Sequence, residues 1–121
     1  MELEKLSHAL TVCKVRETAD IDLGGGLYFV GRTDEEISLV CETCRTPPRT
    51  LAREDGWRGF RVRGTLDFSL TGILSKLSAV LAAERIGIFA VSTYNTDYIL
   101  VKAEHFDRAV RALSEHGYDF V

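Results

Sequence analysis

The stretch Ile88–Lys102, IFAVSTYNTDYILVK, decides the fold that we expect for this chain. It contains two apolar runs rich in β-branched and aromatic residues, which favour a half-buried strand. Between the two runs lies Ser92–Asp97, a cluster of hydroxyl, amide and carboxylate side chains that is typical of a turn. The stretch therefore predicts a β-hairpin with a polar tip.

An amphipathic helix is predicted on each side of this hairpin. Apolar residues recur at helical spacing in Ser69–Glu84 and in Glu104–His116, and a glycine follows each segment. Strands are expected before the first helix, at Gly59–Arg63, and after the second, at Tyr118–Val121. The element order is then βαββαβ. It predicts an α+β, ferredoxin-like fold with an antiparallel sheet and both helices on one face.

The N-terminal half repeats part of this order with shorter connections. Strands are predicted at Ala9–Val15, Leu27–Arg32 and Glu36–Cys41, and an acidic turn joins the last two. The segment Arg16–Asp22 is long enough only for a short helical turn. Two prolines in Cys41–Asp55 predict a brief helix that begins near them.

We therefore divide the chain into two units, 1–58 with short helices and 59–121 with long ones. The likeness between them is one of element order and not of sequence identity. Seven strands are predicted, whereas two full βαββαβ units would contain eight, so one strand is either shared between the units or missing. The sequence leaves open whether Trp57–Arg63 or the C-terminal strand serves both units.

Composition limits the classes of protein to consider. A chain of 121 residues with 45% apolar content can form one ordinary domain or two small units without a cofactor. Its net charge of -3 gives no general attraction to nucleic acids or anionic membranes. Met1–Leu10 lacks the apolar core of a signal peptide, and no apolar run is long enough to span a membrane, so we expect a cytoplasmic protein. Three cysteines, an odd number, indicate reduced thiols.

Particular segments resemble the ACT domain, a βαββαβ module that binds small ligands in regulatory proteins. They are Leu66–Leu74, LDFSLTGIL, and the hairpin Ser92–Lys102, STYNTDYILVK. The hairpin is similar to that of the CASTOR-type arginine sensors, and Leu27–Glu42, LYFVGRTDEEISLVCE, resembles the hairpin of their N-terminal ACT unit. The arrangement also resembles small stand-alone bacterial proteins made of two ACT units. The resemblance implies a non-catalytic, homodimeric tandem ACT protein that binds an amino acid or related metabolite at an ACT–ACT interface.

A free amino acid presents a carboxylate and an ammonium group, so its receptor needs hydrogen-bond donors for the first and an acceptor for the second. The start of the first long helix offers unpaired backbone N–H groups, and Gly72 leaves them accessible. Asp97 at the hairpin tip can accept bonds from the ammonium group, together with the Thr93 hydroxyl. The ligand contacts carried over from the ACT resemblance are Thr71, Gly72, Ile73, Thr93, Tyr94, Asn95, Thr96 and Asp97.

Each of these residues also has a purely structural explanation. Gly72 could allow close packing of a helix on the sheet, and Asn95 and Asp97 could be ordinary turn residues. If the ligand site is degenerate, the chain is a ligand-free dimerising scaffold. That scaffold is the alternative to the sensor, and an unidentified protein partner suits both.

Other functional classes find less support in the sequence. Cys41 and Cys44 form a CxxC pair without a second pair, so neither a metal nor another cofactor is expected. The RGFRV segment at Arg58–Val62 is similar to an RNA-binding strand motif, but it has an arginine and a valine where that motif needs a small residue and an aromatic. No catalytic constellation can be assembled, so we expect that the chain is not an enzyme.

Overall fold

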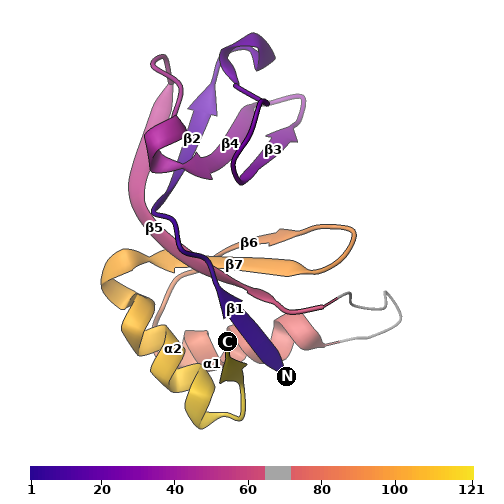
Figure 1. Cartoon of the computed structure of the whole chain (residues 1–121). Coiled ribbons are helices and arrows are strands. Elements are labelled where there is room, and N and C mark those ends of the chain that lie inside the picture. Colours follow the sequence, from indigo (N-terminus) through magenta and orange to yellow (C-terminus); the bar gives the residue numbers. More distant parts are fainter. Residues whose placement is uncertain (65–71) are drawn as a thin grey trace. The chain divides into compact units, whose positions relative to one another are not determined.

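The computed structural model describes residues 1–64 and 72–121 (Figure 1). The chain forms two compact units, which we call unit 1 (Met1–Ser7 with Arg58–Val121) and unit 2 (His8–Trp57). These compact units differ from the predicted division into 1–58 and 59–121 in that the first seven residues group with the C-terminal part of the chain.

Unit 1 contains the predicted βαββαβ order. Its elements are the second part of β5 (Ala52–Val62), α1 (Ile73–Ala83), β6 (Phe89–Ser92), β7 (Asp97–Lys102), α2 (Phe106–Glu115) and β8 (Asp119–Phe120). A 3₁₀ turn at Ala103–His105 leads into α2, so this helix begins slightly later than the sequence predicted. Residues 69–71 of the predicted first helix lie outside the described part of the chain.

A strand that the sequence did not predict, β1 (Glu2–Lys5), completes the sheet of unit 1. It pairs antiparallel with β5 and parallel with β8, so the strand order is β6-β7-β5-β1-β8. The prediction of a purely antiparallel sheet is therefore wrong for the β1–β8 pair. Since β8 still runs opposite to β5, a strand inserted antiparallel to β5 must run parallel to β8.

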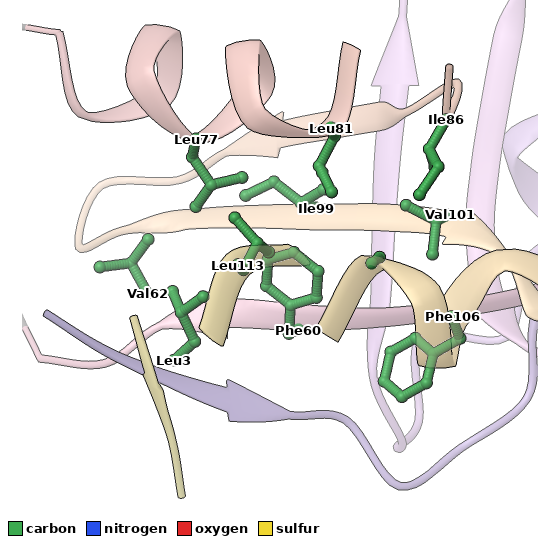
Figure 2. Packing of buried hydrophobic residues seen from close by; sticks show 11 residues of the cluster. Leu3, Phe60, Val62, Leu77, Leu81, Ile86, Ile99, Val101, Phe106 and Leu113 are labelled. Carbon is green, nitrogen blue, oxygen red and sulfur yellow. The ribbon is translucent and has the colours of Figure 1, made fainter. Parts of the chain in front are cut away.

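The core of unit 1 lies between the sheet and its two helices. Figure 2 shows Leu77 and Leu81 of α1 and Leu113 of α2 packed with residues from the strands. The strand residues of this cluster lie two positions apart in β5 and in β7, so they share one face of the sheet. They are Phe60, Val62, Ile99 and Val101. Both helices therefore cover one face of this sheet, as predicted.

Unit 2 is built from β2 (Leu10–Val15), β3 (Tyr28–Arg32), β4 (Ile37–Glu42) and the first part of β5. Its strand order is β3-β4-β2-β5, and all neighbouring pairs are antiparallel. Residues 8–57, all of which the structure describes, contain 3₁₀ turns at Thr18–Asp20 and Thr43–Arg45 but no α-helix.

The brief helix predicted after the prolines is wrong. The 3₁₀ turn Thr43–Arg45 precedes the prolines and ends at Thr46, which is extended (φ −63°, ψ 133°) because a proline ring disfavours helical backbone in the residue before it. The chain then enters β5 at Ala52. The strand that serves both units is β5. Its residues 52–57 pair with β2 in unit 2, and its residues 60–62 pair with β1 in unit 1.

The hairpins of the two units share one register. In β3–β4, Phe29 pairs with Val40. In β6–β7, Phe89 pairs with Leu100. The separation along the chain between Phe29 and Phe89 is the same as that between Val40 and Leu100. Three consecutive residues are buried at matching positions of β4 and β7, and a 3₁₀ turn follows each strand.

Candidate ligand-binding site

The start of α1 is accessible at Gly72. This residue is the N-cap of the helix and has a left-handed backbone (φ 78°), which favours glycine. A β-carbon at Gly72 would meet no atom within 4 Å in the described part of the chain. Close packing on the sheet therefore does not explain this glycine, whereas its backbone conformation does.

The next predicted residue, Ile73, is half-buried and lines a hollow of about 270 Å³ with Lys76 and His116. Thr71, which was predicted beside Gly72, lies outside the described residues.

The tip of the β6–β7 hairpin is a closed turn. The backbone N–H and the hydroxyl of Thr93 both donate to the carbonyl oxygen of Thr96, at 2.9 and 3.0 Å. The Thr96 hydroxyl donates in turn to the carbonyl oxygen of Val62 at 2.7 Å, and Thr96 is only 7% exposed. This hydroxyl therefore ties the hairpin tip to the end of β5, a structural role that the sequence did not suggest.

The remaining tip residues differ in their environments. Asp97 accepts a hydrogen bond from the Ser92 hydroxyl at 2.6 Å, so one of its oxygens is engaged within the hairpin. Tyr94 is 80% exposed. Asn95 is exposed as well, and its side chain has no hydrogen-bond partner among residues 1–64 and 72–121.

Thr93, Asn95 and Thr96 line a hollow of about 490 Å³ at the end of β5. The structure thus brings these predicted residues together, while Ile73 lines the other hollow and Asp97 is in the described lining of neither.

Sequence reasoning missed the charged residues of this larger hollow. Arg61 donates from Nε and Nη2 to the same oxygen of Glu4, Oε1, at 3.1 and 3.0 Å, and from Nη1 to the Tyr98 hydroxyl at 3.1 Å. The bonds to Tyr98 and Glu4 raise the pKa of Arg61. Arg63 also lines the hollow. Charged and apolar residues alternate in Glu2–Glu4 and in Phe60–Arg63, and this pattern is visible in the sequence. It indicates that Glu4 and Arg61 lie together only once β1 is known to pair with β5.

The cysteines form no reactive centre. Cys13, Cys41 and Cys44 are free, and burial raises the pKa of Cys13 to about 11 and also raises that of Cys41. Since the thiolate is the reactive and metal-binding form, the buried thiols are poorly suited to either task. No group of three or more His, Cys, Asp or Glu side chains in the described ranges could hold a metal ion.

The RGFRV segment and the helices can be checked for features of RNA-binding and membrane-spanning proteins. Phe60 of the RGFRV segment is fully buried, and the Arg58 guanidinium stacks 4.4 Å from the centre of the Phe106 ring. Neither side chain offers a free platform on which a nucleotide base could stack. Within residues 1–64 and 72–121, no helix has the length and hydrophobicity needed to cross a membrane.

Comparisons with known proteins give one family match and several structures of similar fold. A family model described as an ACT domain matches residues 52–115. No curated protein sequence matches the chain significantly. Among solved structures, protein Atu0741 from Agobacterium tumefaciens superposes with a TM-score of 0.87 at 30% sequence identity, over 99% of this chain and 91% of that one.

Two aspartate kinase structures share the fold at lower identity. The regulatory subunit of aspartate kinase from Thermus thermophilus, in its ligand-free form, superposes with a TM-score of 0.61 at 9% identity, over 93% of this chain and 95% of that one. The aspartate kinase of Clostridium acetobutylicum, described as an allosteric enzyme, superposes with a TM-score of 0.64 at 16% identity. That match covers 92% of this chain but 32% of the kinase.

Proposed function

This chain belongs to the ACT domain family, and from that membership we propose that it is a non-catalytic regulatory protein that senses an amino acid. One observation carries the proposal. The ACT match spans β5 to α2, and the fold extends over nearly the full length of an aspartate kinase regulatory subunit. The extent of the fold thus corresponds to that of a regulatory subunit.

We further propose that the chain is a tandem of two ACT units, of which unit 2 is a reduced copy. The matching registers of the β3–β4 and β6–β7 hairpins support this proposal. So do the 3₁₀ turns of unit 2, which stand where unit 1 has helical connections. A homodimer in the cytoplasm would then assemble four units, as the ACT-like ligand site at a unit interface requires.

The proposed ligand contacts lie at the start of α1 and at the tip of the β6–β7 hairpin. Gly72 and Ile73 would offer backbone N–H groups, since the first N–H groups of a helix lack intrahelical partners. The hairpin tip, Thr93–Asp97, would offer hydroxyl, amide and carboxylate groups. Tyr94 is exposed enough to form a wall against a second unit. Bound ligand would favour one arrangement of units, and a partner protein would respond to that change.

A ligand-free dimerising scaffold is the second candidate function. It is favoured by the internal bonds of the tip, because Asp97 already binds Ser92 and the Thr96 hydroxyl already binds Val62. These bonds give the tip residues a structural purpose that needs no ligand.

A thermal-shift screen against the twenty amino acids separates the two functions. At a hundredfold excess over Kd, a ligand adds about 2.7 kcal/mol to the free energy of unfolding, which is a shift of several degrees. We expect at least one amino acid to stabilise the protein and Asp97→Ala to reduce that shift. Glu36→Ala is the matched control, since Glu36 accepts a bond from Ser38 beside the tip of the β3–β4 hairpin. If none of the twenty shifts the melting temperature, the scaffold is the better account.

A further inference from the structure

The larger hollow of unit 1 has the size and the chemistry of a small-molecule site. Its volume of about 490 Å³ falls within the range of roughly 300–1,000 Å³ that is usual for ligand pockets. The lining residues that matter here are Glu4, Arg61, Arg63, Asn95 and Tyr98. They come from β1, from the end of β5 and from the tip and second strand of the β6–β7 hairpin.

Glu4 is held in place and still has one oxygen to offer. It lies directly opposite Arg61 in the β1–β5 pair. Both bonds from Arg61 end on Oε1, and the third bond from Arg61, to Tyr98, fixes the guanidinium from the other side. Oε2 accepts no hydrogen bond from the described residues, so Glu4, which lines the hollow, keeps an oriented acceptor to offer.

Arg63 and Asn95 supply donors to the same hollow. Among residues 1–64 and 72–121, the ion-pair partner of the Arg63 guanidinium is Oε1 of Glu2, at 3.9 Å, which is beyond hydrogen-bonding distance. The Arg63 side chain is 56% exposed, and the Asn95 amide has no partner in the part of the chain that the structure describes. A cation and an amide with unused donors match a carboxylate, which accepts charge-assisted bonds from both.

Unit 2 builds a hollow at the corresponding place, and it differs in charge. The end of β2, Lys14–Arg16, and the tip of the β3–β4 hairpin line a hollow of about 260 Å³. β2 and β5 end alike: the last two residues of each strand are a basic residue and a buried valine, and an arginine follows, so Arg61–Arg63 repeats the pattern of Lys14–Arg16. In unit 2, however, three consecutive acidic residues at the hairpin tip, Asp34–Glu36, balance the cations. The tip in unit 1 has no acidic residue in the described lining, so its arginines outnumber Glu4.

We infer that the hollow of unit 1 binds the charged backbone groups of an α-amino acid. Arg63 and Asn95 bind the carboxylate, and Oε2 of Glu4 accepts from the ammonium group. Arg61 and Tyr98 are positioning residues that hold Glu4. This inference rests on the proposed amino-acid-sensing function, and it assigns the carboxylate to Arg63 rather than to the start of α1.

Isothermal titration calorimetry on the intact protein tests the inference. The twenty amino acids are first titrated into the wild type at pH 7, and the tightest binder is then titrated into Arg63→Gln and Glu4→Gln. Each substitution removes a charge-assisted contact, so we expect the affinity to fall at least tenfold in both variants. Arg16→Gln is the matched control, because Arg16 holds the corresponding position in unit 2, and we expect it to leave the affinity unchanged.

Derivatives of the ligand test the same contacts without any change to the protein. The N-acetyl derivative of the bound amino acid lacks the ammonium group, and its α-amide lacks the carboxylate, so we expect the wild type to bind neither. An amino acid that binds Arg63→Gln as tightly as the wild type, or an N-acetyl derivative that binds as well as the parent, overturns the inference and leaves the sensing function in place. Absence of binding heat with all twenty amino acids overturns both.

Discussion

Replacement of Gly59 by alanine should destabilise unit 1, because this glycine lets β5 approach β7 closely. A β-carbon at Gly59 would lie 2.9 Å from the carbonyl oxygen of Ile99 and 3.3 Å from Cγ of Leu100. The first contact is with backbone, which cannot rotate away. The same close approach brings Arg61 to the Tyr98 hydroxyl, so the substitution also tests how the larger hollow is built.

The expected magnitude follows from two opposing effects. Overpacking in a close-packed site lowers the free energy of unfolding by about 1–3 kcal/mol. Alanine also reduces the conformational entropy of the unfolded chain, which raises the free energy of unfolding by about 0.4–1 kcal/mol. We therefore expect a net loss of about 1–2 kcal/mol. With a urea m-value of about 2 kcal/mol/M, the unfolding midpoint falls by roughly 0.5–1 M.

Urea unfolding followed by circular dichroism at 222 nm is the assay for Gly59→Ala. The signal reports unit 1, since both α-helices lie there and residues 8–57 contain none. Gly31→Ala and Gly87→Ala are the controls, because a β-carbon at either position would have no neighbour within 4 Å in the described residues and neither has a positive φ. A Gly59→Ala midpoint equal to or above that of the wild type would refute the close approach of β5 to β7.

Three further predictions concern the thiols and the ion pair. In the native protein, Ellman's reagent should label Cys44 rapidly and label the buried Cys13 and Cys41 only after unfolding; fast labelling of Cys44→Ser would contradict this. The Cys13 thiol titrates near 9.0 when unfolded and near 11 when folded, so its stabilising effect is complete below pH 9 and is lost as the pH rises to 11. The loss from Cys13 is about 2–3 kcal/mol and is measurable by Trp57 fluorescence in urea; Cys13→Ala should lose less stability over this pH range, since only Cys41 among the buried thiols still has a raised pKa there. Arg61→Gln should cost only about 0.5–1 kcal/mol in thermal unfolding, since Arg61 and Glu4 are 40% and 38% exposed; a loss above 3 kcal/mol would show that the pair is more buried in solution.

Local sequence patterns were sufficient to predict the two hairpins. Apolar β-runs and a polar turn lie within a few residues of each other at Ile88–Lys102, so both strands and the tip of this hairpin could be predicted from the local sequence. The second long helix, Glu104–His116, was predicted nearly to its end, because Gly117 takes the left-handed backbone (φ 91°) that ends a helix.

The missed elements depend on contacts between distant parts of the chain. Strand β1 is short and charged, and it is a strand only because β5 and β8 lie on either side of it. The first part of β5, AREDGW, has a composition that disfavours strands, and pairing with β2 stabilises it there. For the same reason the sequence did not indicate Glu4, Arg61 and Arg63 as a group.

Amide chemical-shift mapping by NMR tests the central claim most directly, namely that unit 1 is an ACT unit that binds an amino acid at its hairpin tip. With the amino acid selected by the thermal-shift screen, we predict that the amide signals of Thr93–Asp97 and Arg63 move on titration while those of Thr33–Ile37 in unit 2 stay in place. If no amide of unit 1 moves with any of the twenty amino acids, or if the shifts are confined to unit 2, the account is contradicted.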